Sequence, residues 1–106
     1  MVLEDVYKQL HEERLCDSAY DFSENYLGKA KSYYSVLKAR NAEPSTDALV
    51  MLELSLKDKA LVFESDTYEF YSRLRNGLLM LSNEVKDYRD RRCIERLRES
   101  QYGVAA

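Results

Sequence analysis

Apolar residues recur every three or four positions along most of the chain, and polar residues fill the positions between them. This spacing matches the 3.6-residue turn of an α-helix, not the strict alternation of a β-strand. We therefore predict an all-α fold, with four short helices followed by one long C-terminal helix. The first three predicted helices cover about residues 3–15, 19–27 and 31–39. The fourth starts after Ser45, and the long fifth helix runs from 65 or 66 to about 99.

Capping signals support several of these boundaries. Ser18, with Asp21 three residues later, predicts the start of the second helix. Gly28 is typical of the residue just beyond a helix C-terminus. Pro44 disfavours helical structure at the residue before it, and Ser45 is a typical N-cap for the fourth helix. Residues 57–64 either continue that helix or form a separate helical turn, and the pattern leaves both open.

The long predicted helix carries an apolar seam with alternating spacings of three and four, as in the a and d positions of a heptad repeat. The seam consists of Tyr71, Leu74, Leu78, Leu81, Val85 and Tyr88. We expect it to pair with a second copy of the chain, although packing within one chain would use the same pattern. The next two seam positions are Arg92 and Glu95, which favour ion pairs between chains. Gly77 disfavours the helix by about 1 kcal/mol relative to alanine and indicates a close backbone approach.

Composition narrows the class of protein. The chain has 106 residues, 45% of them apolar, with three glycines, one proline and a formal net charge of −3. Two widely separated cysteines and one histidine, His11, predict no metal site, and the free thiols favour a cytoplasmic location. The acidic start of the chain is unlike a signal peptide, and no apolar run is long enough to cross a membrane. Without a nucleophile, phosphate-binding or dinucleotide motif, we expect neither enzymatic activity nor a cofactor.

The segment 18–52 carries a more specific signal. Its order is helix, glycine turn, helix, loop and helix, with Leu27-Gly28 at the turn, Tyr34 and Leu37 at two buried positions, and Pro44-Ser45 before the next helix. This arrangement resembles the Cro/C1-type, lambda-repressor-like helix-turn-helix DNA-binding family. Glu24 occupies a position where that family usually has a small residue, so the second helix is expected to contain one extra residue. The resemblance implies a DNA-binding domain over residues 1–64. The apolar pattern predicts a long helix for dimerisation or packing over 65–100, and the end of the chain is expected to form a frayed tail over 101–106.

The resemblance also assigns roles to residues of the recognition helix, about 31–39. Four of them would face base edges in the major groove: Lys31, Ser32, Ser35 and Val36. Five flanking residues would contact phosphates: Lys29, Tyr33, Lys38, Arg40 and Asn41. The charge pattern agrees independently, because residues 29–40 contain four cations and no acid in an otherwise acidic chain.

We therefore predict a small sequence-specific transcriptional regulator, a repressor by analogy, that binds double-stranded DNA as a homodimer. The alternative is a helical adaptor or antitoxin-like factor that keeps the helix-turn-helix shape and binds a protein partner through its long helix. A simpler interpretation of the basic helix is a solvated face that balances acidic neighbours.

Overall fold

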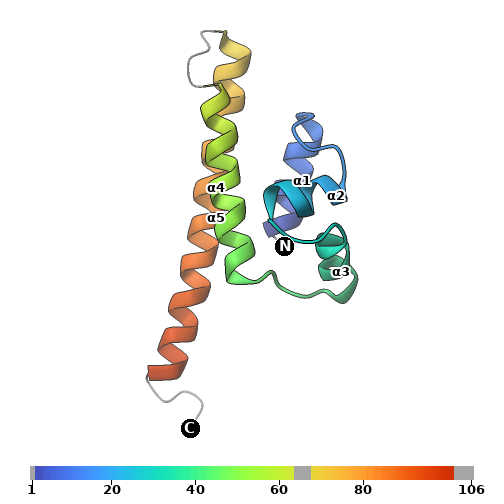
Figure 1. Cartoon of the computed structure of the whole chain (residues 1–106). Coiled ribbons are helices and arrows are strands. Elements are labelled where there is room, and N and C mark those ends of the chain that lie inside the picture. Colours follow the sequence, from blue (N-terminus) through green and yellow to red (C-terminus); the bar gives the residue numbers. More distant parts are fainter. Residues whose placement is uncertain (1, 64–67, 102–106) are drawn as a thin grey trace.

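The computed structural model describes residues 2–63 and 68–101 and confirms an all-α fold with a long C-terminal helix. In Figure 1, α4 and α5 lie side by side as an antiparallel hairpin, and the shorter helices pack against one side of it. The helices, in chain order, are α1 (Val2–Glu12), α2 (Ala19–Asp21), the π-helix η1 (Phe22–Tyr26), α3 (Tyr33–Arg40), α4 (Thr46–Val62) and α5 (Glu69–Gln101).

The first helix is shorter than predicted. It ends at Glu12 because Arg14 adopts a left-handed backbone conformation with φ +59°. The amide of Leu15 then donates to the carbonyl of Leu10 at 2.8 Å, which closes the turn. The apolar face of α1 still packs as expected, since Leu3 and Val6 are fully buried.

The second predicted helix is two elements in the structure. Ser18 caps α2 as predicted, because its hydroxyl accepts a hydrogen bond from the amide of Asp21 at 3.2 Å. The chain then widens into the five-residue π-helix η1. A π-turn accommodates one residue more than an α-turn. The extra residue expected relative to the Cro/C1-type family stays a prediction, and η1 is a place in the chain that can hold it. Gly28 follows with φ +64°, as its place after a helix predicted.

The third and fourth helices differ from the sequence prediction at single boundaries. α3 begins at Tyr33, two residues later than expected. α4 begins after Ser45, whose hydroxyl accepts a hydrogen bond from the amide of Ala48 at 3.3 Å, so that N-cap is confirmed. α4 continues to Val62, which shows that most of the segment 57–64 extends this helix. The N-cap expected at Ser65 or Asp66 lies outside the described residues.

The hairpin and the shorter helices share one hydrophobic core. Leu49, Leu52 and Leu56 of α4 are fully buried between α5 and the shorter helices. A polar group is buried among them: Glu53 forms ion pairs with Lys57 and with Arg89 of α5. The hydroxyl of Ser82 also donates to the carbonyl of Glu53 at 3.2 Å. These contacts fix the alignment of α5 along α4.

The prediction that the apolar seam of α5 pairs with a second copy of the chain is wrong for its central residues. Leu78, Leu81 and Val85 are buried in the core of their own chain, at no more than 4% exposure. They cannot also form an interface between chains. The rest of the seam is partly buried: Tyr71 stacks on Phe63, just after α4, Tyr88 packs against the core, and Leu74 lines a groove.

Two further expectations for α5 are wrong. Arg92 is predicted to pair between chains, but it lies within its own chain, where it binds the loop before α4. No described part of the chain approaches Gly77 closely, because a Cβ atom added there would meet nothing within 4 Å.

Candidate nucleic-acid interface

The N-terminal end of α3 is attached to η1 through the side chain of Ser23. This side chain is completely buried. Its hydroxyl donates to the carbonyl of Ala19 at 2.9 Å and accepts a hydrogen bond from the amide of Tyr34 at 3.0 Å. The formal N-cap, Ser32, makes no side-chain capping bond. Ser23 therefore satisfies an amide in the first turn of α3 from another helix, which explains why α3 begins at Tyr33.

The inner face of α3 packs against α1 and η1 through aromatic rings. The ring of Tyr34 lies 5.1 Å from that of Phe22 and 5.2 Å from that of Tyr7, centroid to centroid. Burial raises the pKa of Tyr34 to about 12. Leu37 completes this face at 9% exposure. The two buried positions expected for the recognition helix, Tyr34 and Leu37, are thus confirmed as core residues.

Two residues predicted to contact phosphate are engaged inside the chain. The hydroxyl of Tyr33 accepts a hydrogen bond from the amide of Ser45 at 3.0 Å and lies 3.2 Å from its hydroxyl. Lys29 forms an ion pair with Asp47 of α4. Hydrogen bonds from Lys29 and Ser45 lower the pKa of Asp47 to about 2. Both residues therefore hold α3 and its preceding turn against the start of α4.

The C-terminal end of α3 is closed by Asn41. Asn41 adopts a left-handed conformation, with φ +50°, and its amide donates to the carbonyls of Leu37 and Lys38. The amide of Ala42 donates to the carbonyl of Leu37 at 2.9 Å. This pattern is a Schellman motif, and asparagine tolerates the left-handed conformation better than most residues. Asn41 therefore ends the helix, whatever its exposed side chain contacts.

The loop after α3 is held by α5. Arg92 donates to the carbonyl of Pro44 at 2.6 Å and to the hydroxyl of Thr46 at 3.3 Å, and it lies 3.6 Å from the carboxylate of Glu43. Its side chain is 9% exposed. Its Nε is buried without a hydrogen-bond partner among the described residues. The sequence did contain a signal that Arg92 faces the hairpin interior. Arg92 occupies the next a/d position of the heptad pattern after Tyr88.

The outer face of α3 and its preceding turn is exposed and basic. The segment 29–41 contains no carboxylate, and its exposed side chains are cationic, hydroxylic or alanine, apart from Val36 and Asn41. Lys38 lies nearer to α1, where it lines a hollow together with Glu4 and Glu12. The predicted site residues that the structure leaves exposed on this surface are Lys31, Ser32, Ser35, Val36, Lys38, Arg40 and Asn41. We call these seven residues the basic face. Of the nine predicted site residues, only Lys29 and Tyr33 are partly buried.

Other kinds of site find no support in the described part of the chain. No group of three histidine, cysteine, aspartate or glutamate residues there is arranged to hold a metal ion. Cys16 is buried, and burial together with the nearby Asp21 carboxylate raises the pKa of its thiol to about 12, which makes it a poor nucleophile. Among residues 2–63 and 68–101, none of the helices has the length and apolar character needed to cross a bilayer.

Ser23 provides a test of how α3 is positioned. Replacing Ser23 by alanine leaves the buried Tyr34 amide without its partner, so we expect the free energy of unfolding to fall by about 1–3 kcal/mol. Urea denaturation followed by circular dichroism measures this change. Ser32→Ala is the matched control, and it should change the free energy by less than about 0.5 kcal/mol. Equal effects of the two substitutions would contradict the role given to Ser23.

Comparison with known proteins identifies the family but not an activity. Residues 3–98 match a family of unknown function, DUF6626. The chain belongs to this family. The match extends from α1 through most of α5, so the matched range includes the hairpin as well as the shorter helices. No curated protein and no solved structure gives a significant match. The resemblance to the Cro/C1-type family remains a prediction from the sequence.

Proposed function

We propose that this member of the DUF6626 family is a small DNA-binding regulator that places α3 in the major groove of double-stranded DNA. The observation that carries the proposal is the basic face: an acid-free surface with three exposed cations, behind which Tyr34 and Leu37 are buried. Lys31, Lys38 and Arg40 supply charge for phosphates and guanine edges. Val36 is 40% exposed and can contact a thymine methyl group.

The surroundings of α3 suit this role. Main-chain and hydroxyl groups form the contacts at Ser23, Tyr33 and Asn41 that hold α3 in place. These contacts do not use the exposed cations of α3. A helix that reads DNA must project from its domain with a fixed orientation. In Figure 1, α3 lies on the side of the molecule away from α5, with its first residue in contact with the start of α4. A DNA duplex could therefore approach α3 without first meeting α5.

Selection from sheared DNA tests the proposal. The full chain is incubated with random genomic fragments at about 100 mM salt, and the retained fragments are sequenced. We expect a recurring, roughly palindromic motif, and an affinity that falls steeply with salt because phosphate contacts release counterions. Retention of no fragments, or of fragments without a shared motif, would contradict sequence-specific binding.

A protein-binding adaptor is the second candidate, and a specific surface favours it. A shallow, mainly apolar groove of about 330 Å³ lies between α4 and α5, lined by Lys57, Ala60, Leu61, Arg75 and Leu79. Leu61 is 60% exposed there. An amphipathic partner helix could cover such a surface. This role predicts no DNA retention in the selection experiment, and loss of partner binding for Leu61→Asp with the basic face intact.

A further inference from the structure

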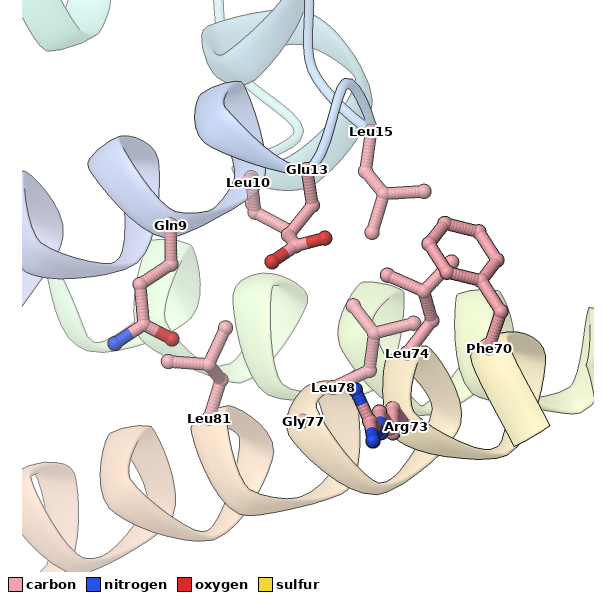
Figure 2. A pocket seen from close by; sticks show the side chains of 10 residues that line it. All are labelled: Gln9, Leu10, Glu13, Leu15, Phe70, Arg73, Leu74, Gly77, Leu78 and Leu81. Atoms are coloured by element: carbon pink, nitrogen blue, oxygen red, sulfur yellow. The ribbon is translucent and has the colours of Figure 1, made fainter.

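A second groove lies between the end of α1 and the N-terminal half of α5. Its volume is about 280 Å³, and Figure 2 shows the side chains that line it. Leu10, Leu78 and Leu81 form a buried apolar base. Leu15 and Glu13 lie on the α1 side, and Phe70 and Leu74 lie on the α5 side. The groove is therefore apolar at its base and polar at its edges.

Contacts within the described part of the chain do not explain why two positions of α5 beside this groove are a glycine and an exposed phenylalanine. Gly77 lies in the middle of a helix, where glycine is unfavourable, yet a Cβ atom added there would meet nothing within 4 Å. Phe70 is 62% exposed, although it is one of the largest apolar side chains. The two residues are seven positions apart, which places them on the same helix face at a separation of about 10 Å. One face thus carries both a protruding ring and an open position.

The charges at the groove are opposite on its two sides. Glu13, just after α1, is exposed, and its carboxylate points toward the groove in Figure 2. Arg73 of α5 is exposed and pairs with Glu69 at 3.0 Å, and both side chains are more than three-quarters exposed. Exposed pairs of this kind contribute little energy, so Arg73 can exchange its partner readily.

We propose that a second copy of this chain occupies the groove, with the two α5 helices antiparallel about a two-fold axis between residues 73 and 74. In this arrangement Phe70 of each chain fills the open position beside Gly77 of the other. Arg73 of each chain pairs with the other chain's Glu13. A two-fold interface requires that complementary features lie on the same face of one chain. The ring and the open position satisfy this requirement, as do the two opposite charges.

This interface differs from the heptad seam and deepens the proposed function. It uses the exposed face of Phe70, Leu74 and Gly77 together with the end of α1, so Leu74 is the seam residue that it shares at the surface. Leu78 and Leu81 of the seam lie beneath it as the buried base of the groove. Its biological role rests on the proposed function, because a two-fold dimer presents two copies of α3 to a palindromic site. Its existence does not depend on DNA and is measured without it.

The first test fills the open position. Sedimentation velocity of the full chain should show a dimer at tens of micromolar, and Gly77→Leu should raise its dissociation constant at least about tenfold. Gly77→Ala adds only one methyl group and is the matched control, which should have a smaller effect. Circular dichroism checks that α5 is intact in both variants. A monomeric wild-type chain, or a dimer that Gly77→Leu leaves unchanged, overturns the proposal.

The second test uses the charges and identifies the occupant. Glu13→Arg and Arg73→Glu each place like charges together in the proposed dimer, so each variant alone should dissociate at least about tenfold more readily. A mixture of the two variants restores both attractive pairs, and a heterodimer should form with near wild-type affinity. If each variant dimerises as the wild type does, or the mixture stays monomeric, the proposed pairing is wrong. DNA binding by a monomeric wild-type chain would overturn this interface and leave the proposed function standing.

Discussion

Removing two cations from the basic face, with Lys31→Ala and Arg40→Ala together, is expected to weaken specific DNA binding about 100-fold at about 100 mM salt. Lys31 is expected to contribute a base-edge contact, and Arg40 a phosphate contact. Both side chains are exposed, so their removal should not change the fold. Fluorescence anisotropy with a duplex taken from the selection experiment measures the affinity.

The salt dependence separates the two roles. Arg40→Ala alone should weaken binding to all duplexes similarly and reduce the slope of log affinity against log salt by about one. Lys31→Ala should also relax the base preference at one position of the site. The charge-matched control is Lys59→Ala with Lys86→Ala, two exposed lysines of the hairpin. If this control weakens binding as strongly as the first pair, the basic face is not the DNA-binding surface.

Replacing Arg89 by alanine is expected to lower the free energy of unfolding by about 3 kcal/mol, because it leaves the buried carboxylate of Glu53 with Lys57 as its remaining partner. The side chain of Glu53 is 8% exposed, that of Arg89 17% and that of Lys57 45%, so Lys57 cannot replace the less exposed guanidinium. Urea denaturation at pH 7 measures the loss.

The same substitution should change the pH dependence of stability. Burial alone would raise the pKa of Glu53, but the hydrogen bonds and charges of Lys57 and Arg89 outweigh it and hold the pKa below its ordinary value. A lowered pKa stabilises the wild type at neutral pH, and this contribution is lost as the pH falls through the folded-state value. Without Arg89 the pKa of Glu53 should rise, so protonation no longer destabilises the variant.

The difference in stability between wild type and Arg89→Ala should therefore be largest near neutral pH and shrink below about pH 4. Arg91→Ala provides the control, because Arg91 is exposed and, within residues 2–63 and 68–101, donates only to a main-chain carbonyl of its own helix, at 3.4 Å. Its effect should stay below about 0.5 kcal/mol at every pH. A pH-independent loss in Arg89→Ala would show that packing, and not the charge of Glu53, explains the effect.

Local signals in the sequence were enough to predict most of the helices. Ser18 and Ser45 cap helices where they were expected, and Gly28 adopts the left-handed conformation that follows a helix end. These features depend on neighbouring residues, which a sequence displays directly. The early end of α1 carried no such signal, because the left-handed residue is Arg14 and not a glycine.

Contacts between distant segments were harder to predict. A heptad pattern shows that a helix face is buried but does not show what buries it. Leu78, Leu81 and Val85 were therefore predicted to pack against a second chain, whereas in the structure they pack in the core of their own chain. The anchoring roles of Ser23 and Arg92 depend on partners 11 and 48 positions away in the chain. The exposed residues of the basic face could be predicted better, because an acid-free run of cations is itself a property of the sequence.

The anchoring of α3 at both ends has a consequence for the energetics of any complex that it forms. Ser23 fixes its first turn, the Schellman motif at Asn41 fixes its last, and Arg92 holds the loop beyond. A segment that is already ordered loses little conformational entropy on binding. Recognition by α3 should therefore resemble rigid docking, and hydrogen exchange at its amides should be slow in the free protein and change little in the complex.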